Sequence, residues 1–251
     1  MKNVFVLMLH LLVFQLYGQQ KDSLIAATKP VSILQRKSAA YIFPAGLLGY
    51  GILSQEMKPL KMVDHNIRSD FQEDYPGFHT HLDDKLQYMP VASVYALGFA
   101  GIKGQHNFID KTALYFLSNA IMGLSVDALK TASHRLRPDG SDYRAFPSGH
   151  TATAFAAAEF MWQEYKDVSL WYGVAGYTMA TATGGLRMLN NKHWFSDVVT
   201  GAGIGIASTK LSYLLYPIIK KQLQGKKHEG LIVVPTYQYG SPGLAATIPL
   251  N

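Results

Sequence analysis

Charge divides the body of this chain of 251 residues into segments, because six long stretches between residues 38 and 209 contain no Asp, Glu, Lys or Arg. They are 12 to 19 residues long, rich in Ala, Gly, Leu and Met, and lack the strict alternation that marks a half-buried strand. The stretches are Ser38–Gln55, Leu86–Ile102, Thr112–Val126, Ala145–Ala158, Val168–Leu186 and Val198–Thr209. The pattern predicts an all-α fold, a six-helix bundle, with polar loops between the helices, the longest at Lys58–Lys85.

These stretches leave open what surrounds the helices. An ordinary transmembrane helix needs about 20 apolar residues. Longer versions of the stretches take in charged residues such as Glu159, Asp197 and Lys210. An ionised side chain in mid-membrane costs about 2.5–3.5 kcal/mol on insertion scales. We therefore favour a bundle on the outer side of an inner membrane, soluble or shallowly embedded, over six membrane spans.

The first residues have the pattern of an export signal. A basic start at Met1–Asn3 precedes an apolar run over Val4–Tyr17, and the chain turns polar after Gly18. This order is typical of a secretory signal peptide, which we predict at residues 1–18, with an uncleaved membrane anchor as the alternative. Export predicts a bacterial cell envelope as the location. It also argues against nucleic acid as the partner of this basic chain, whose net charge is +6.

The rest of the chain is predicted to have three parts. Residues 19–37 form an N-terminal polar segment, 38–219 a helical domain, and 220–251 a basic segment with a C-terminal tail. In the tail, Leu231–Tyr237 and Gly243–Pro249 flank a turn sequence and predict a short β-hairpin. The chain contains no cysteine, which excludes disulfides, thiolate catalysis and zinc sites built on cysteine.

The first of three motifs places two cations near the end of a predicted helix. Lys130 and Arg137 are seven residues apart, just before Pro138. Seven residues make two helical turns, so both side chains project to one side. An Arg fork together with a Lys point charge suits a phosphate. Taken alone, the motif is explained at least as well by a basic helix end that the helix dipole favours.

The second motif lies where a charge-free helix begins, at Ser148, Gly149 and His150 after a proline. Free N–H groups at a helix start bind anions, and Gly149 lets a ligand approach the backbone. His150 would then stand at the edge of the anion, placed to move a proton. The alternative is a Ser cap followed by a structural His.

The third motif contains Arg187, His193 and Asp197. A His and an Asp four residues apart share one helix face. A carboxylate bonded to one ring nitrogen fixes the tautomer and raises the basicity of the other, as a nucleophilic imidazole needs. Arg187 adds a third cation. An ordinary helical His–Asp pair is the alternative.

Together the three motifs resemble one family. Lys-x6-Arg-Pro, Pro-Ser-Gly-His and Arg-x5-His-x3-Asp occur in the order and spacing of the type 2 phosphatidic acid phosphatase family, within residues 109–216. Its superfamily also includes bacterial non-specific acid phosphatases and vanadium haloperoxidases. The chain is similar to exported bacterial members. It departs from the family at Leu186, where Ser or Ala usually precedes the Arg, and so lacks one side-chain hydrogen bond to the site.

The resemblance implies an all-α bundle with its site at one end of the central helices, and a phosphatase that uses no metal or other cofactor. His193 would attack phosphorus and form a phosphohistidine, and Asp197 would orient it. His150 would protonate the leaving alcohol and then activate water. The groups that would bind the phosphoryl oxygens are Lys130, Arg137, Ser148, the Gly149 backbone and Arg187.

The resemblance implies a phosphorylated substrate, with a lipid favoured: phosphatidate, phosphatidylglycerol phosphate, undecaprenyl pyrophosphate or lipid A. The enzyme would act on the periplasmic side, at the membrane surface or in the inner membrane. Three alternatives stay open: a vanadium-dependent haloperoxidase that uses the same anion site, a soluble periplasmic non-specific acid phosphatase, and a non-catalytic envelope protein.

A second cluster lies outside the three motifs. His79, His81, Asp83 and Asp84 have a composition found at metal sites. A solvated loop is the favoured interpretation, because such short patterns are common by chance. The same loop is a candidate to cover the site entrance and influence substrate choice.

Overall fold

The computed structural model describes residues 39–225, 232–238 and 241–247, with side chains from 39 to 222. The predicted signal peptide and N-terminal polar segment lie outside these residues. The described chain up to Tyr213 forms one compact unit, and the part from Leu214 onward forms a second. The domain boundaries predicted from the sequence remain predictions.

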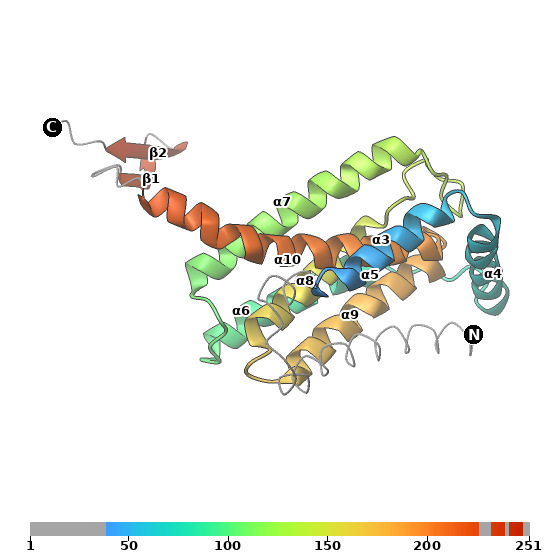
Figure 1. Ribbon diagram of the computed structural model, residues 1–251, viewed down its shortest axis with the longest axis horizontal. Coiled ribbons are helices and arrows are strands. Elements are labelled where there is room, and N and C mark those ends of the chain that lie inside the picture. Colours follow the sequence, from blue (N-terminus) through green and yellow to red (C-terminus); the bar gives the residue numbers. More distant parts are fainter. Residues whose placement is uncertain (1–38, 226–231, 239–240, 248–251) are drawn as a thin grey trace. The chain divides into compact units, whose positions relative to one another are not determined.

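The all-α class predicted for the main unit is confirmed, but the count of six helices is wrong. Six of the helices in the described residues overlap the six charge-free stretches. The other two, α4 and α5, occupy the segment predicted to be a polar loop. The described helices are α3 (Ile42–Ser54), α4 (Lys58–Asp74), α5 (Leu82–Leu86), α6 (Met89–Phe99), α7 (Phe108–Ser133), α8 (Gly149–Tyr165), α9 (Leu170–Leu189) and α10 (Phe195–Gly225) (Figure 1).

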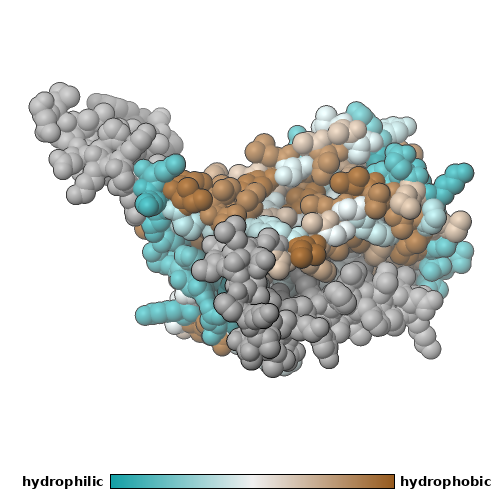
Figure 2. Space-filling view, in the orientation of Figure 1, coloured by the Kyte–Doolittle hydropathy of each residue, from teal (hydrophilic) through white to brown (hydrophobic). Residues whose placement is uncertain are grey.

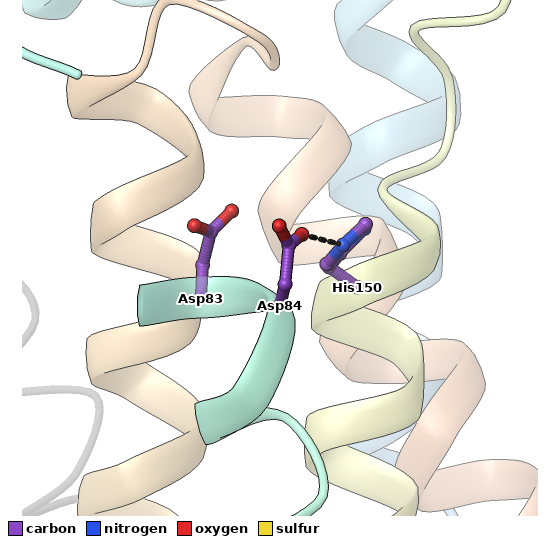
Figure 3. A group of neighbouring side chains, drawn as sticks. All are labelled: Asp83, Asp84 and His150. Carbon is purple, nitrogen blue, oxygen red and sulfur yellow. Dashed lines mark hydrogen bonds and ion pairs between the residues drawn. The ribbon is translucent and has the colours of Figure 1, made fainter. Parts of the chain in front are cut away.

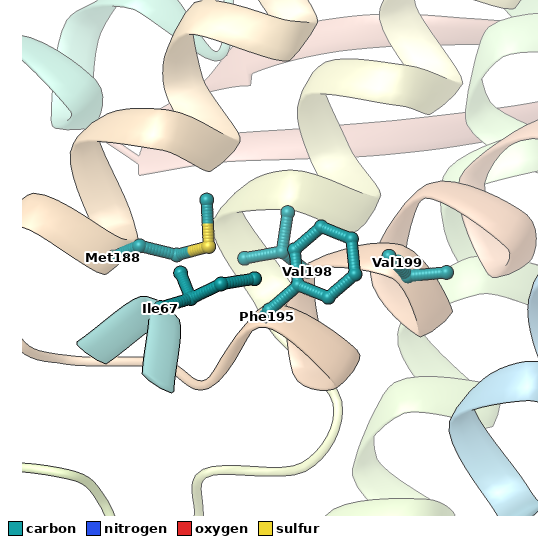
Figure 4. Close-up of a cluster of buried hydrophobic side chains, with 5 residues drawn as sticks. All are labelled: Ile67, Met188, Phe195, Val198 and Val199. Carbon is teal, nitrogen blue, oxygen red and sulfur yellow. The ribbon is translucent and has the colours of Figure 1, made fainter. Parts of the chain in front are cut away.

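Helix α4 escapes a search for charge-free stretches because it is amphipathic. Its apolar residues Val63, Ile67 and Phe71 recur every four positions and so share one face, while most of the other positions are polar or charged. That face packs on the end of α9 and the start of α10. The buried cluster there comprises Ile67, Met188, Phe195, Val198 and Val199 (Figure 4).

Helix α8 is the centre of the main unit and packs against α6, α7 and α9. It also meets the first part of α10 at backbone distance, since a Cβ added at Gly205 would lie 2.3 Å from the Ala152 carbonyl oxygen. The facing Ala152 and Ala156 are fully buried. Small residues on both helices therefore allow the start of α10 to lie directly against α8.

Apolar side chains also gather on the surface. Figure 2 shows them over α3 and α7, where Ile42, Ile52, Phe116 and Leu124 are exposed. Two helices among the described residues, at Phe108–Ser133 and Phe195–Gln222, have the length and apolar composition needed to cross a membrane. Of the 18 most apolar consecutive residues in each helix, 22% are buried in α7 and 67% in α10. Of these two helices, α7 therefore exposes more of its apolar surface.

The second unit contains the end of α10 and two antiparallel strands. β1 (Ile232–Gln238) pairs with β2 (Ser241–Thr247), with Val234 opposite Ala245. The sequence pattern predicts two strands at 231–237 and 243–249.

Candidate active site

The tautomer of His193 is set by a backbone group. Its ring is buried, and Nδ1 lies 2.7 Å from the Ala145 carbonyl oxygen. A carbonyl oxygen can only accept a hydrogen bond, so Nδ1 carries the hydrogen. Nε2 therefore carries no hydrogen and keeps its lone pair. This is the arrangement that a nucleophilic imidazole requires.

The cations of the first motif lie around this ring. Arg137 Nη1 donates to His193 Nε2 at 3.2 Å and to the Lys192 carbonyl at 3.1 Å. Lys130 Nζ donates to the Arg144 carbonyl at 2.6 Å. Burial, reinforced by the positive charges of Arg187, Arg137 and Lys130, holds the pKa of His193 well below 6.5. The imidazole is therefore neutral near pH 7.

Asp197 lies beside His193 but does not hydrogen-bond it. The distance from His193 Nδ1 to Asp197 Oδ2 is 3.6 Å, beyond hydrogen-bond range. Asp197 Oδ2 instead accepts from the Trp194 backbone N–H at 2.8 Å. The orienting contact predicted for Asp197 is thus made by the Ala145 carbonyl, while Asp197 fixes the backbone next to His193.

A buried ion network behind Asp197 is not signalled by the motifs. Arg135 Nη1 donates to Asp197 Oδ1 at 2.8 Å, and Nη2 donates to Asp64 Oδ2 at 2.6 Å. Asp64 also accepts the Ser196 backbone N–H at 2.8 Å. Arg135 is turned inward, toward these two buried carboxylates. The sequence feature that could have pointed to Asp64 is the presence of an acidic residue next to the apolar residues of α4.

The second motif joins the first and the third. Ser148 caps α8 by accepting from the Thr151 backbone N–H at 3.4 Å and the Thr151 hydroxyl at 2.8 Å. Its own N–H donates to the Asp197 carbonyl at 3.0 Å. A Cβ added at Gly149 would lie 3.9 Å from Lys130 Cε, so the Lys130 stem lies next to the start of α8. The structure thus brings all three motifs to one end of the main unit.

Helix α5 contacts the site with two consecutive carboxylates (Figure 3). Asp83 Oδ2 accepts from Arg187 Nη1 at 2.6 Å, and Asp84 Oδ1 accepts from His150 Nε2 at 2.8 Å. Asp84 Oδ2 also lies 3.1 Å from His81 Nδ1. The prediction of a solvated loop is wrong for Asp83, which lies in α5 and is 1% exposed, whereas His79, His81 and Asp84 are exposed. The segment contacts two motif residues, and its role at the site entrance stays a prediction.

Arg187 is held by Asp83, but its guanidinium has a hydrogen-bond donor to spare. Asp83 fixes one end of its guanidinium, and Asn190 Nδ2 donates to Asp83 Oδ1 at 3.2 Å. Within the described side chains, Arg187 Nε is the one buried nitrogen or oxygen without a hydrogen-bond partner. A buried donor without an acceptor is costly, and an anion oxygen would satisfy it. Arg187 is therefore suited to receive a phosphoryl group.

The environment of His150 has opposing effects on its charge. Burial, followed by the positive charge of Arg187, lowers the pKa of His150 below 6.5, while the hydrogen bond to Asp84 and the charges of Asp83 and Asp84 act to raise it. The hydrogen bonds from His150 and His81 lower the pKa of Asp84. Asp84 is consequently an ionised carboxylate that favours the protonated form of His150.

The same three residues form the candidate metal group in the described part of the chain. The ligand atoms of Asp83, Asp84 and His150 all lie within 4.8 Å of one another. Their charges are already matched within the protein, since Arg187 pairs with Asp83 and His150 with Asp84. We therefore assign no metal to this group, and a metal-independent site remains the prediction.

Comparison with known proteins agrees with the motifs. Residues 111–221 match the model of the PAP2 superfamily. The lipid A 1-phosphatase of Porphyromonas gingivalis is 41% identical over 177 residues, which are 68% of this chain and 40% of that protein. The chain thus spans less than half the length of this curated relative.

Two solved structures are similar. One is a transmembrane PAP2-type phosphatidylglycerolphosphate phosphatase from Bacillus subtilis, with 18% identity and a TM-score of 0.50. The match covers 71% of this chain and 98% of the Bacillus chain. LpxE of Aquifex aeolicus has 24% identity and a TM-score of 0.44, covering 58% and 93%. The Bacillus structure shows a shared fold. Residues 111–221 thus match the PAP2 superfamily, in agreement with the family predicted from the three motifs.

Proposed function

We propose that the protein is a phosphatase that hydrolyses a phosphate ester through a phosphohistidine on His193. The observation that carries the proposal is the state of this ring: it is buried and neutral, its Nδ1–H is fixed on the Ala145 carbonyl, and its Nε2 faces Arg137. A neutral imidazole held in one tautomer is the activated form of this nucleophile.

In the first step, the Nε2 lone pair attacks phosphorus and the ester P–O bond breaks. His150 gives its proton to the departing oxygen, which leaves as an alcohol. Lys130, Arg137 and Arg187 stabilise the charge on the equatorial oxygens, where phosphoryl transfer needs it. The unpaired Nε–H of Arg187 supports a direct role in holding one of these oxygens.

In the second step, water attacks phosphorus and the P–N bond breaks. His150, now neutral, takes a proton from this water, and phosphate is released. Ser148 and the Gly149 backbone support the anion from the start of α8. Asp197 holds the backbone on which His193 stands.

The substrate we propose is a lipid phosphate on the periplasmic side of a bacterial envelope. Two observations support it: the lipid A 1-phosphatase relative and the exposed apolar face of α7. The export signal predicted from the sequence agrees with it. The activity of the relative is a proposal for this chain, because the chain spans 40% of that protein's length.

The test is phosphate release by the full chain, purified in detergent, from lipid A 1-phosphate and from phosphatidate. We expect the wild type to release phosphate without added metal. In His193→Ala we expect kcat to fall by roughly 10⁴-fold or more, because the variant lacks the nucleophile. Equal hydrolysis by the two proteins would overturn the mechanism.

A further inference from the structure

The proposed acid of the reaction shares its hydrogen bond with a carboxylate. His150 Nε2 lies 2.8 Å from Asp84 Oδ1, and the Asp84 side chain is 46% exposed. Any oxygen that takes a proton from His150 must come within hydrogen-bond distance of this same ring. The leaving group therefore enters next to Asp84, on the open side of the site.

Asp84 is an ionised carboxylate on this side of the site, and its ion-pair partners are His81 and His150. The groups that act on Asp84 are His81, His150 and Arg187. Arg187 is paired with Asp83 at 2.6 Å, so its positive charge is partly balanced before a substrate arrives. Figure 3 shows Asp84 directed at His150 and Asp83 beside it on the same turn of α5, so Asp84 is the carboxylate next to the leaving group.

We propose that Asp84 determines the class of substrate: it selects phosphomonoesters whose leaving group is an uncharged alcohol and rejects diphosphates, whose leaving group is itself a phosphate. A second phosphate would bring further negative charge against Asp84, whose ion-pair partners are His81 and His150. His150 loses its positive charge when it gives its proton to the leaving group, and like charges placed together are strongly unfavourable. An alcohol adds no charge and can share His150 with Asp84. This inference rests on the proposed function and adds the substrate class to it.

The test compares two probes with the same apolar group, farnesyl phosphate and farnesyl diphosphate, in identical detergent micelles. The readout is the ratio of kcat/KM for the two probes, with the terminal phosphate of the diphosphate as the transferred group. The variants are Asp84→Asn and Asp84→Ser, which both remove the charge. A matched control is Asp167→Asn, because Asp167 is exposed and lies beyond the far end of α8 from His150, about 25 Å away along the helix.

We expect the wild type and Asp167→Asn to prefer the monophosphate by about tenfold or more, and both Asp84 variants to raise the relative rate on the diphosphate by about tenfold. A loss of overall activity in either variant does not affect this ratio, so a purely structural role for Asp84 would leave it unchanged.

Two results would overturn the inference while leaving the proposed function intact: a wild type that hydrolyses both probes equally well, or Asp84 variants with the wild-type ratio. Failure of the proposed function has a different signature. In that case the wild type would release phosphate from the monophosphate no faster than His193→Ala.

Discussion

The two histidines of the site stand in different surroundings. His193 is 3% exposed and is held by a carbonyl oxygen, by Arg137 and by the backbone that Asp197 fixes. The side chain of His150 is 31% exposed, and its hydrogen-bond partner comes from α5, a helix of five residues. One side of the site is built from long packed helices, and the other from a short element near solvent.

This difference matches the tasks proposed for the two residues. Attack on phosphorus needs a fixed nucleophile, because a small displacement of the reacting atom costs much of the rate. The leaving group differs between substrates, so the residue that protonates it stands where a varied group can enter. We therefore expect changes on the His193 side to affect stability and rate together, and changes on the His150 side to affect substrate preference and pH dependence.

The largest effect on stability is expected from Arg135→Ala. The truncation leaves Asp64 and Asp197, 1% and 0% exposed, buried without their shared cation. Breaking a buried ion network in this way costs about 3–5 kcal/mol. The free energy of unfolding, measured by urea titration with tryptophan fluorescence, checks this value.

Arg144→Ala is the matched control for Arg135→Ala. Arg144 pairs with Asp127 at 2.6 Å, but the two side chains are 52% and 71% exposed. An exposed pair contributes about 0–1 kcal/mol. Similar losses of stability in the two variants would contradict the importance of the buried network.

A smaller effect on the same side is expected from Gly201→Ala. The added Cβ would lie 2.5 Å from the Ser148 carbonyl oxygen, so α10 or the start of α8 must shift. Overpacking of this kind costs about 1–3 kcal/mol, and the displaced Ser148 turn should also lower kcat. Thermal unfolding and phosphate release measure the two effects.

Gly123→Ala tests whether any glycine in a long helix would give the same result. Gly123 lies inside α7, and a Cβ there would meet no atom within 4 Å. Alanine should stabilise this helix by up to about 1 kcal/mol and leave kcat unchanged. A loss of activity at Gly123 equal to that at Gly201 would argue against a special contact between α10 and the Ser148 turn.

The smallest effect concerns pH on the His150 side. Asp84 and Asp83 raise the pKa of His150 against burial and the charge of Arg187. Replacing Asp84 with Asn removes the negative charge that raises the pKa of His150, so this pKa should fall further below 6.5. A proton donor with a lower pKa loses its proton at lower pH, so the alkaline limb of kcat/KM should move to lower pH.

The pH profile of kcat/KM on farnesyl phosphate, for the wild type and Asp84→Asn, measures this shift. An unchanged alkaline limb would show that the carboxylate does not act on the charge of His150. A limb that moves to higher pH would contradict the expected direction of the pKa change.

Much of the site follows from sequence spacing. Each motif falls at a helix end, and the helix ends meet because α8 lies between α7, α9 and α10. The charge-free stretches predict these helices since buried helices with small, apolar residues need no charged face. The same rule misses α4, in which apolar residues every four positions are separated by charges.

The partners of the motif residues could not be predicted in the same way. The Ala145 carbonyl that holds His193 is a backbone group and has no signature in residue type. Asp64 reaches Arg135 across 71 positions, and Asp84 reaches His150 across 66. Such contacts depend on how α4 and α5 pack, and residue types and spacing along the chain do not reveal that packing.

The central claim is that Nε2 of His193 takes the phosphoryl group. The direct measurement is peptide mapping by mass spectrometry after rapid alkaline quench of His150→Ala turning over p-nitrophenyl phosphate. This substrate needs little protonation of its leaving group, and the variant lacks the residue that activates water. We predict a phosphate on the nitrogen of His193 that is stable to base, lost in acid, and missing in His193→Ala. A phosphate on any other residue, or none during measurable turnover, would contradict the account.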